Sequence, residues 1–211
     1  MSEIVRNYGA LPFTVPPEEM GFPQAMAEQT DTIYRNYELG KILDQGNTYA
    51  CVGYALAALL QAEPFRQSLD PKKIYREARE LDNTPGEGVA LDKGVAYLGK
   101  EGYIDGIYWT LSPEEVVSYI NNKSPVIFST PWFSGMDKPE KDGRIVVKGS
   151  YVGAHAYMGF RWDGLKKRLW IVNSYGEGWG LDGTGYITYN DLGKLLRKDA
   201  IACALLEKRP S

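Results

Sequence analysis

The hydrophobic pattern of the chain changes from helical to strand-like near residue 124, and this change limits the folds that the sequence can adopt. Before it, apolar residues recur at helical spacing in the segments 50–63, 71–82, 89–102 and 112–122. Beyond it, short runs rich in β-branched and aromatic residues alternate with Gly and Asp. These strand-like runs are 125–133, 144–153, 155–163, 168–176, 183–191 and 200–206. The pattern predicts an α+β protein, with a helical part followed by a sheet part.

The same pattern suggests how the chain is divided. Residues 1–40 contain several prolines and little periodicity, so we expect an extended N-terminal arm packed on the body rather than a separate domain. Residues 41–211 are expected to form the body, with a helical lobe over about 41–123 and a sheet lobe over about 124–211. A cleft between two such lobes is a natural place for a site.

Composition argues against several classes of function. The 211 residues are 44% hydrophobic and 24% charged, which is ordinary for a globular protein. The net charge of -3 and the pI near 5.4 disfavour a general affinity for nucleic acid or for an anionic membrane. No stretch reaches the roughly 18 apolar residues of a membrane span, and the N-terminus lacks the pattern of a signal peptide. We therefore expect no nucleic-acid partner, no membrane partner and a cytoplasmic protein.

Two cysteines and one histidine are too few for a disulfide scaffold or a zinc site. Cys51 and Cys203 allow a single bridge at most, and that bridge stays open as an alternative. His155 is the only histidine, and no paired Cys or His spacing typical of zinc ligands is present. The sequence predicts neither a metal nor a cofactor.

Cys51 lies where the polar turn LDQGNTYA passes into the apolar helix CVGYALAALL. A thiol at a helix N-terminus faces unpaired backbone N–H groups and the positive end of the helix dipole, and both favour the thiolate. A free cysteine is also commonly a small buried hydrophobic residue. Cys51 by itself therefore leaves two interpretations open, a reactive nucleophile or a core residue.

Three further polar residues favour the nucleophile. Gln45 lies six residues before Cys51, across the turn at Gly46, where its side-chain N–H and the Cys51 backbone N–H can form an oxyanion hole. His155 begins one strand-like run, and Asn173 ends another. Each is more often a structural residue when it occurs singly, but the set of four in this order is uncommon by chance.

The stretches that hold these residues resemble the papain-like (C1-type) cysteine peptidases. DQGNTYAC matches the Gln-Gly turn that leads to the nucleophile of that family, and AHAYMGF matches the strand with its histidine. NSYGEGWGLDGTGYI matches its Asn-Ser-Trp-Gly, Trp-Gly and Gly-Tyr signature, so the likeness runs from about Gln45 to Tyr189. It implies a two-lobe fold, with a helical N-terminal lobe, a β-barrel-like C-terminal lobe and the active site in the cleft.

The resemblance also implies a role for each matching residue. Cys51 would be the nucleophile, His155 the general base and acid, and Asn173 the residue that orients His155. Gln45 would donate to the oxyanion, and Trp179 would shield the His–Asn pair from water. The implied activity is that of a cysteine endopeptidase, which hydrolyses a polypeptide substrate through an acyl-enzyme intermediate without a cofactor.

Four small residues are implied to contact the substrate. Gly86 and Gly88 in PGEGVALD would present backbone to an extended peptide, while Ala154 and Ala156 would line the pocket for the side chain two residues before the scissile bond. The alternative interpretation is that all four are merely close-packed small residues.

The sequence departs from the family pattern at several points. The upstream cysteine of the usual Cys-Gly-Ser-Cys-Trp motif is absent, which resembles bacterial, archaeal or phage members and implies a cytoplasmic or phage-associated protein. Tyr175 replaces the Trp of Asn-Ser-Trp-Gly and keeps an aromatic wall. His155 and Asn173 follow Cys51 more closely than the roughly 130 to 150 residues of the papain signature, so we expect reduced loops and a more open cleft. The arm is too short for the usual helical prodomain, and we expect no zymogen control.

Two other functions remain as alternatives. The chain could be a different Cys-His acyl-transfer enzyme, such as a transglutaminase-like protein or an amidase, although Gln45 and Asn173 favour the papain pattern. It could also be an inactive papain-like binding module, although all four polar positions are intact.

Overall fold

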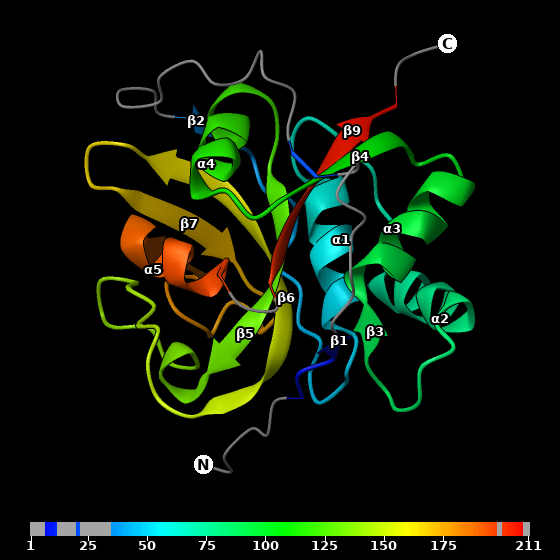
Figure 1. The fold of residues 1–211 in the computed structure, drawn as a ribbon, viewed down its shortest axis with the longest axis horizontal. Coiled ribbons are helices and arrows are strands. Elements are labelled where there is room, and N and C mark those ends of the chain that lie inside the picture. The colour runs from blue at the N-terminus through cyan, green and yellow to red at the C-terminus, as the bar shows by residue number, and fades with distance from the viewer. Residues whose placement is uncertain (1–6, 12–19, 22–34, 198–199, 209–211) are drawn as a thin grey trace.

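The computed structural model describes residues 7–11, 20–21, 35–197 and 200–208 (Figure 1). Most of the N-terminal arm predicted over residues 1–40 lies outside the described residues. In the part of the chain that is described, no helix combines the length and the apolar character needed to span a membrane.

The four predicted helices are confirmed as α1, α2, α3 and α4. Helices α2 and α4 each begin with a proline that follows a capping residue. The caps are Asp70 and Ser112, whose side chains accept hydrogen bonds from backbone N–H groups at 2.9 Å and 3.2 Å. Helix α1 has no side-chain cap at its start, which leaves its first N–H groups for other partners. The bounds are Cys51–Gln61 for α1, Pro71–Leu81 for α2, Leu91–Lys100 for α3 and Pro113–Asn122 for α4.

The main sheet has seven strands within the described ranges, and its neighbouring strands run antiparallel. Their order is β4-β9-β5-β6-β7-β8, with β2 paired to the end of β6. No pairing joins β4 to β8 in the described structure, so the sheet is open and fits the expected barrel-like lobe only loosely. The bounds are Arg35–Asn36 for β2, Ile104–Thr110 for β4, Val126–Phe133 for β5, Tyr151–Asp163 for β6, Arg168–Val172 for β7, Thr184–Thr188 for β8 and Ile201–Glu207 for β9.

The central strands of this sheet are covered on both faces. Side chains alternate along a strand, so Ala156 and Met158 of β6 pack in one hydrophobic cluster with α1 and α3. Tyr157, between them, packs in a second cluster with α4 and α5. Figure 1 shows α1, α2 and α3 on one side of β5 and β6, and α4 and α5 on the other. This packing presses the start of α1, with Cys51, against the face of β6 that carries Ala156.

Three segments differ from the sequence prediction. Strand β4 forms in a stretch for which no strand was expected, because it pairs with β9 at the edge of the sheet. The run 144–153 is a strand only from Tyr151 onward, since Gly143 and Gly149 turn the chain with φ of 86° and 98°. The run 183–191 leaves the sheet at Thr188, whose side chain caps helix α5 (Tyr189–Leu195).

A separate pair of short strands lies at the start of α1. Strand β1 (Ala10–Leu11) pairs in parallel with β3 (Val89–Ala90), which leads directly into α3. In Figure 1 both strands lie near the N-terminal end of α1. The N-terminal part of the chain is thereby brought to Cys51.

Candidate active site

Cys51 is the first residue of α1, and its side chain is 0% exposed. The turn before it is closed by the left-handed Gly46 (φ 59°) and by Asp44, whose carboxylate accepts a hydrogen bond from the Gly46 N–H. Ala156, the residue after His155, packs in one hydrophobic cluster with Cys51, and its backbone acts to lower the pKa of the thiol. The structure therefore brings the thiol together with the strand that carries the histidine.

His155 and Asn173 form a hydrogen-bonded pair. The distance between His155 Nε2 and Asn173 Oδ1 is 2.8 Å, and both residues are buried. The backbone N–H of Ser174 donates to the same Oδ1 at 2.8 Å, which identifies that atom as the amide oxygen. An amide oxygen only accepts, so Nε2 carries the hydrogen and Nδ1 is the ring atom that exchanges a proton when the imidazole is neutral.

Aromatic rings enclose the imidazole of His155. Tyr175 stacks on it at 5.0 Å between ring centroids, and Trp132 meets it edge-on at 4.9 Å. Trp179, expected to shield the pair, packs edge-on against Tyr175 at 6.0 Å and reaches His155 through that ring. The wall that the resemblance implied is present, with Tyr175 and Trp132 as the rings in contact.

Gln45 is 2% exposed and joins three segments. Its side-chain Nε2 donates to Thr48 O at 2.7 Å and to Asn7 O at 3.2 Å, while its Oε1 accepts from the Ser174 hydroxyl at 2.6 Å. The amide is thus held in place by the Asn173–Ser174 corner. One of its two N–H groups binds the carbonyl oxygen of a residue from the N-terminal part of the chain.

Residues 7–11, which we call the covering segment, lie over this site. Asn7 O accepts from Gln45, and the Tyr8 ring meets the His155 ring at 5.9 Å. Ala10 packs in one cluster with Cys51, and the backbone of Gly9 and of Ala10 acts to lower the pKa of the thiol. Gly9 O accepts from the Val89 N–H at 2.7 Å, next to the β1–β3 pair. The cleft is therefore not open at Cys51, contrary to the sequence expectation, because the sulfur lies buried beneath this segment.

Burial changes the acid–base behaviour of the Cys51 thiol. Burial raises the pKa of Cys51 above its ordinary value, and the hydrogen bonds that face the sulfur only oppose this rise. The opposing bonds come from the backbone of Ala156, Gly9, Val52 and Ala10. The helix N-terminus alone was expected to favour the thiolate, but in the covered site the loss of solvent is the larger effect.

The four residues expected to contact substrate lie in different surroundings. Gly88 touches the covering segment, since a Cβ on it would lie 2.6 Å from Gly9 O. Ala156 is buried beside Cys51, and Ala154 is partly buried on the same face of β6. Gly86 is exposed with φ of 102°, and a Cβ on it would meet no atom within 4 Å. Three of the four thus lie around the covered cleft, and Gly86 lies at a turn outside it.

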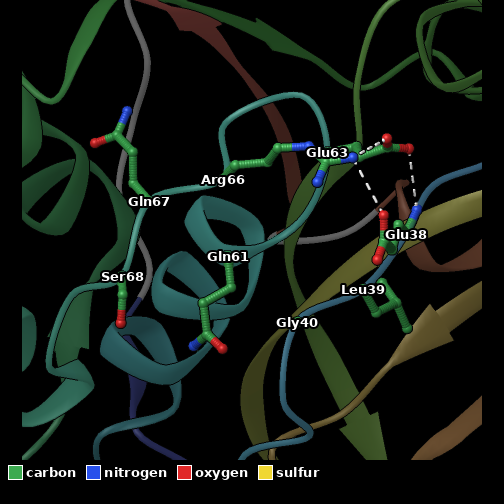
Figure 2. Close-up of a pocket in the computed structure, with 8 residues that line it drawn as sticks. All are labelled: Glu38, Leu39, Gly40, Gln61, Glu63, Arg66, Gln67 and Ser68. Carbon is green, nitrogen blue, oxygen red and sulfur yellow. Dashed lines mark hydrogen bonds and ion pairs between the residues drawn. The ribbon is translucent and has the colours of Figure 1, made fainter.

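A separate pocket of about 310 Å³ lies at the other end of α1 (Figure 2). Its charged groups pair with one another, because the Arg66 guanidinium contacts Glu38 at 3.2 Å and Glu63 at 2.5 Å. These side chains are largely exposed, and such pairs contribute little binding energy in water. The pocket contains none of the predicted site residues. Within the described ranges, no group of three His, Cys, Asp or Glu side chains is placed to hold a metal ion.

Sequence reasoning missed three residues that contact the site. Trp132 reaches His155 because β5 and β6 pair with Thr130 opposite His155, and no sequence pattern gives that register. Tyr8 arrives with the covering segment. Asp137 accepts hydrogen bonds from the Trp132 Nε1 at 2.8 Å and from the Tyr8 hydroxyl at 2.6 Å. Only the long-range fold brings these three together.

The fold, rather than the sequence, connects the chain with known proteins. No protein-family model matches the sequence, and no curated protein matches it. Among solved structures, the chain is similar to xylellain, a cysteine protease from Xylella fastidiosa, with 15% identity, a TM-score of 0.77 and coverage of 99% of this chain and 100% of xylellain.

Two further structures give the same result. Digestive procathepsin L 3 of Tenebrio molitor has 13% identity and a TM-score of 0.69, over 95% of this chain and 76% of the procathepsin. A cysteine protease of Carica candamarcensis has 16% identity and a TM-score of 0.63, over 81% of this chain and 94% of that protein. The chain therefore has the fold of the papain-like cysteine proteases.

Proposed function

We propose that the chain is a cysteine endopeptidase that hydrolyses peptide bonds with Cys51, His155 and Asn173. The observation that carries the proposal is the buried 2.8 Å bond between His155 and Asn173, on a strand whose next residue, Ala156, packs in one cluster with the Cys51 thiol at the start of α1. A thiol, an imidazole and an orienting amide are the three parts that nucleophilic acyl transfer requires. The solved structures that share the fold are named as cysteine proteases, and this supports the proposal.

In the proposed reaction, His155 Nδ1 accepts the thiol proton as Cys51 Sγ adds to the carbonyl carbon of a peptide bond. The imidazolium gives that proton to the leaving amine as the C–N bond breaks, and a thioester remains on Cys51. His155 then takes a proton from a water molecule that attacks the thioester. The C–S bond breaks, the carboxylic acid leaves, and the proton returns to the thiol. Asn173 keeps the imidazole in the tautomer that both proton transfers need.

Gln45 and the backbone N–H of Cys51 are the proposed donors to the oxyanion. The Gln45 Nε2 already donates to a peptide carbonyl oxygen, that of Asn7, and a substrate carbonyl would replace it. The Ser174 hydroxyl holds the amide in this orientation, so the donor needs little rearrangement when negative charge develops on the substrate.

The substrate class that fits is an extended polypeptide. The covering segment supports this class, because its backbone pairs with β3 next to Gly88, where no side chain keeps the two backbones apart. A substrate would take this place after the segment leaves. Ala154 and Ala156 would then line a pocket for an apolar side chain, and Gly86 would contact the substrate only if the turn at residues 85–87 moves.

Gln45→Ala is expected to lower kcat roughly 100- to 1,000-fold with little change in KM, because the lost hydrogen bond strengthens only as the oxyanion forms. Ser174→Ala is the matched control, since it removes the hydrogen bond to Gln45 Oε1 and keeps the donor. Steady-state hydrolysis of a fluorogenic peptide measures both variants. An unchanged kcat in folded Gln45→Ala would show that the residue only braces its turn.

The proposed function is tested by labelling with an epoxide or vinyl-sulfone peptide inhibitor, followed by mass spectrometry. We expect one adduct per chain, mapped to Cys51, together with loss of peptide hydrolysis. An adduct on Cys203, which is buried in β9, would contradict the assignment. Labelling of Cys51 without hydrolysis of any peptide would indicate an inactive module or an acyl-transfer enzyme with another acceptor.

A further inference from the structure

Asp137 lies directly after the short 3₁₀ helix Ser134–Met136, in the connection between β5 and β6. One of its carboxylate oxygens, Oδ1, accepts two hydrogen bonds, from Trp132 Nε1 at 2.8 Å and from the Tyr8 hydroxyl at 2.6 Å. Its backbone oxygen accepts a third, from Trp179 Nε1 at 2.9 Å. A single partly buried residue is therefore bonded to three aromatic side chains.

All three rings belong to the surroundings of His155. Trp132 and Tyr8 meet the imidazole edge-on, with centroid distances of 4.9 Å and 5.9 Å. Trp179 packs against Tyr175, which stacks on the imidazole. Asp137 acts on the imidazole through these rings, because it accepts a hydrogen bond from each of the three aromatic side chains.

Asp142 offers a comparison within the same connection. Its carboxylate also accepts from a tyrosine hydroxyl, that of Tyr186, at 2.6 Å. Tyr186 packs on Trp170 and is not among the rings around His155. The Asp142 carboxylate therefore holds only its own loop to a neighbouring strand. In contrast, one oxygen of Asp137 accepts a hydrogen bond from the sheet lobe and another from the covering segment.

We propose that Asp137 is a positioning residue for His155 and also the anchor that holds the covering segment over Cys51. Its bond to Trp132 keeps the indole edge against the imidazole whether or not the site is covered. Its bond to Tyr8 exists only in the covered site, so the segment is fastened to the same carboxylate that orders the base. The proposal rests on the proposed function in that His155 is taken as the catalytic base.

The separation of the two bonds is the basis of the test. Tyr8→Phe removes only the bond from the covering segment and leaves Trp132 its acceptor. Asp137→Ala removes both bonds, and Asp137→Asn keeps an amide oxygen that can accept from both donors. Asp142→Ala is the matched control, because it removes a carboxylate–tyrosine bond away from the site.

Three measurements distinguish the two roles. The rate of Cys51 alkylation by iodoacetamide reports how often the site is uncovered and needs no turnover. The indole N–H resonance of Trp132 and the ring resonances of the single histidine report the arrangement of the aromatic rings around His155. The separate kcat and KM values for a peptide substrate report its effect on the reaction.

We expect Tyr8→Phe to raise the alkylation rate several-fold, with the Trp132 indole resonance shifted little and kcat not reduced. Asp137→Ala should also raise the alkylation rate, and in addition should shift the Trp132 and His155 resonances and lower kcat about tenfold at similar KM. Asp137→Asn should restore most of the kcat, and Asp142→Ala should leave all three measurements as in the unsubstituted protein.

Unchanged His155 resonances and kcat in Asp137→Ala would overturn the positioning role, and an unchanged alkylation rate in Tyr8→Phe would overturn the anchor. If Asp137→Ala does not fold, Tyr8→Phe still tests the anchor and Asp137→Asn tests the positioning role. A kcat of Asp137→Asn between that of the unsubstituted protein and background supports the positioning role. Should no variant hydrolyse peptides, the alkylation rates and resonances still decide this proposal while the proposed function fails.

Discussion

Cys51→Ala is expected to abolish peptide hydrolysis, with a loss of at least about 10⁴-fold in kcat. The thiol supplies the only covalent step of the proposed reaction, and the described residues hold no second thiol near His155. Alanine fits the position because the side chain is small and fully buried in the first turn of α1. Hydrolysis of a fluorogenic peptide, with the melting temperature as a check on folding, measures the effect.

Cys203→Ala is the matched control for this substitution. Cys203 is equally buried, but it lies in β9 with its pKa raised by burial alone. We expect full activity and a loss of roughly 1–2 kcal/mol in the free energy of unfolding, from the small cavity left in the core. Hydrolysis that survives in Cys51→Ala and fails in Cys203→Ala would reverse the assignment of the nucleophile.

Gly9→Ala is expected to uncover the site and raise the rate of Cys51 alkylation roughly 5- to 150-fold. A Cβ on Gly9 would lie 1.9 Å from the backbone oxygen of Tyr49, so the covering segment cannot keep its position. Overpacking of this kind destabilises an arrangement by roughly 1–3 kcal/mol, and each 1.4 kcal/mol is a tenfold change in occupancy. Alkylation with iodoacetamide at several pH values measures the effect, and peptide hydrolysis should rise with it.

The pH profile of that alkylation should also move. Burial is the largest influence on the Cys51 thiol and raises its pKa, so uncovering the sulfur should lower the midpoint of the profile. The bonds from Gly9 and Ala10 are lost as well, but those from Ala156 and Val52 remain. Gly99→Ala, in α3 with no atom within 4 Å of the added Cβ, is the control. Equal rates in both variants would mean that the segment does not limit access to the sulfur.

Local signals account for the parts of the fold that the sequence predicts. Helices α2 and α4 carry a capping side chain followed by proline, and β6 carries aromatic residues spread along its length. Strand β4 escaped prediction because its place depends on β9, nearly a hundred residues away in the chain. Helix α5 escaped it because Thr188 serves both as the end of a strand and as a cap.

The candidate site also contains residues that short sequence motifs predict and residues that only the fold brings in. Gln45 and Cys51 lie within one turn and its helix, and Asn173 and Ser174 are neighbours, so short motifs point to them. Trp132 and Tyr8 reach His155, and Asp137 binds both of them, only through strand pairing and through the return of the N-terminal segment. The expected thiolate at Cys51 shows the limit of local reasoning, because the helix terminus is visible in the sequence and the burial that outweighs it is not.

Under the proposed function, the pairing of β1 with β3 makes the covering strand a competitor of the substrate that belongs to the same molecule as the site. Its release is a unimolecular equilibrium, so dilution of the protein does not shift it, unlike the release of a separate inhibitor. A substrate binds only the fraction of molecules that are open, and its apparent dissociation constant is the intrinsic one divided by that fraction. We therefore expect the stability of the β1–β3 pairing to lower the apparent affinity for any substrate, and long polypeptides, which make many backbone contacts, to be hydrolysed more readily than short peptides.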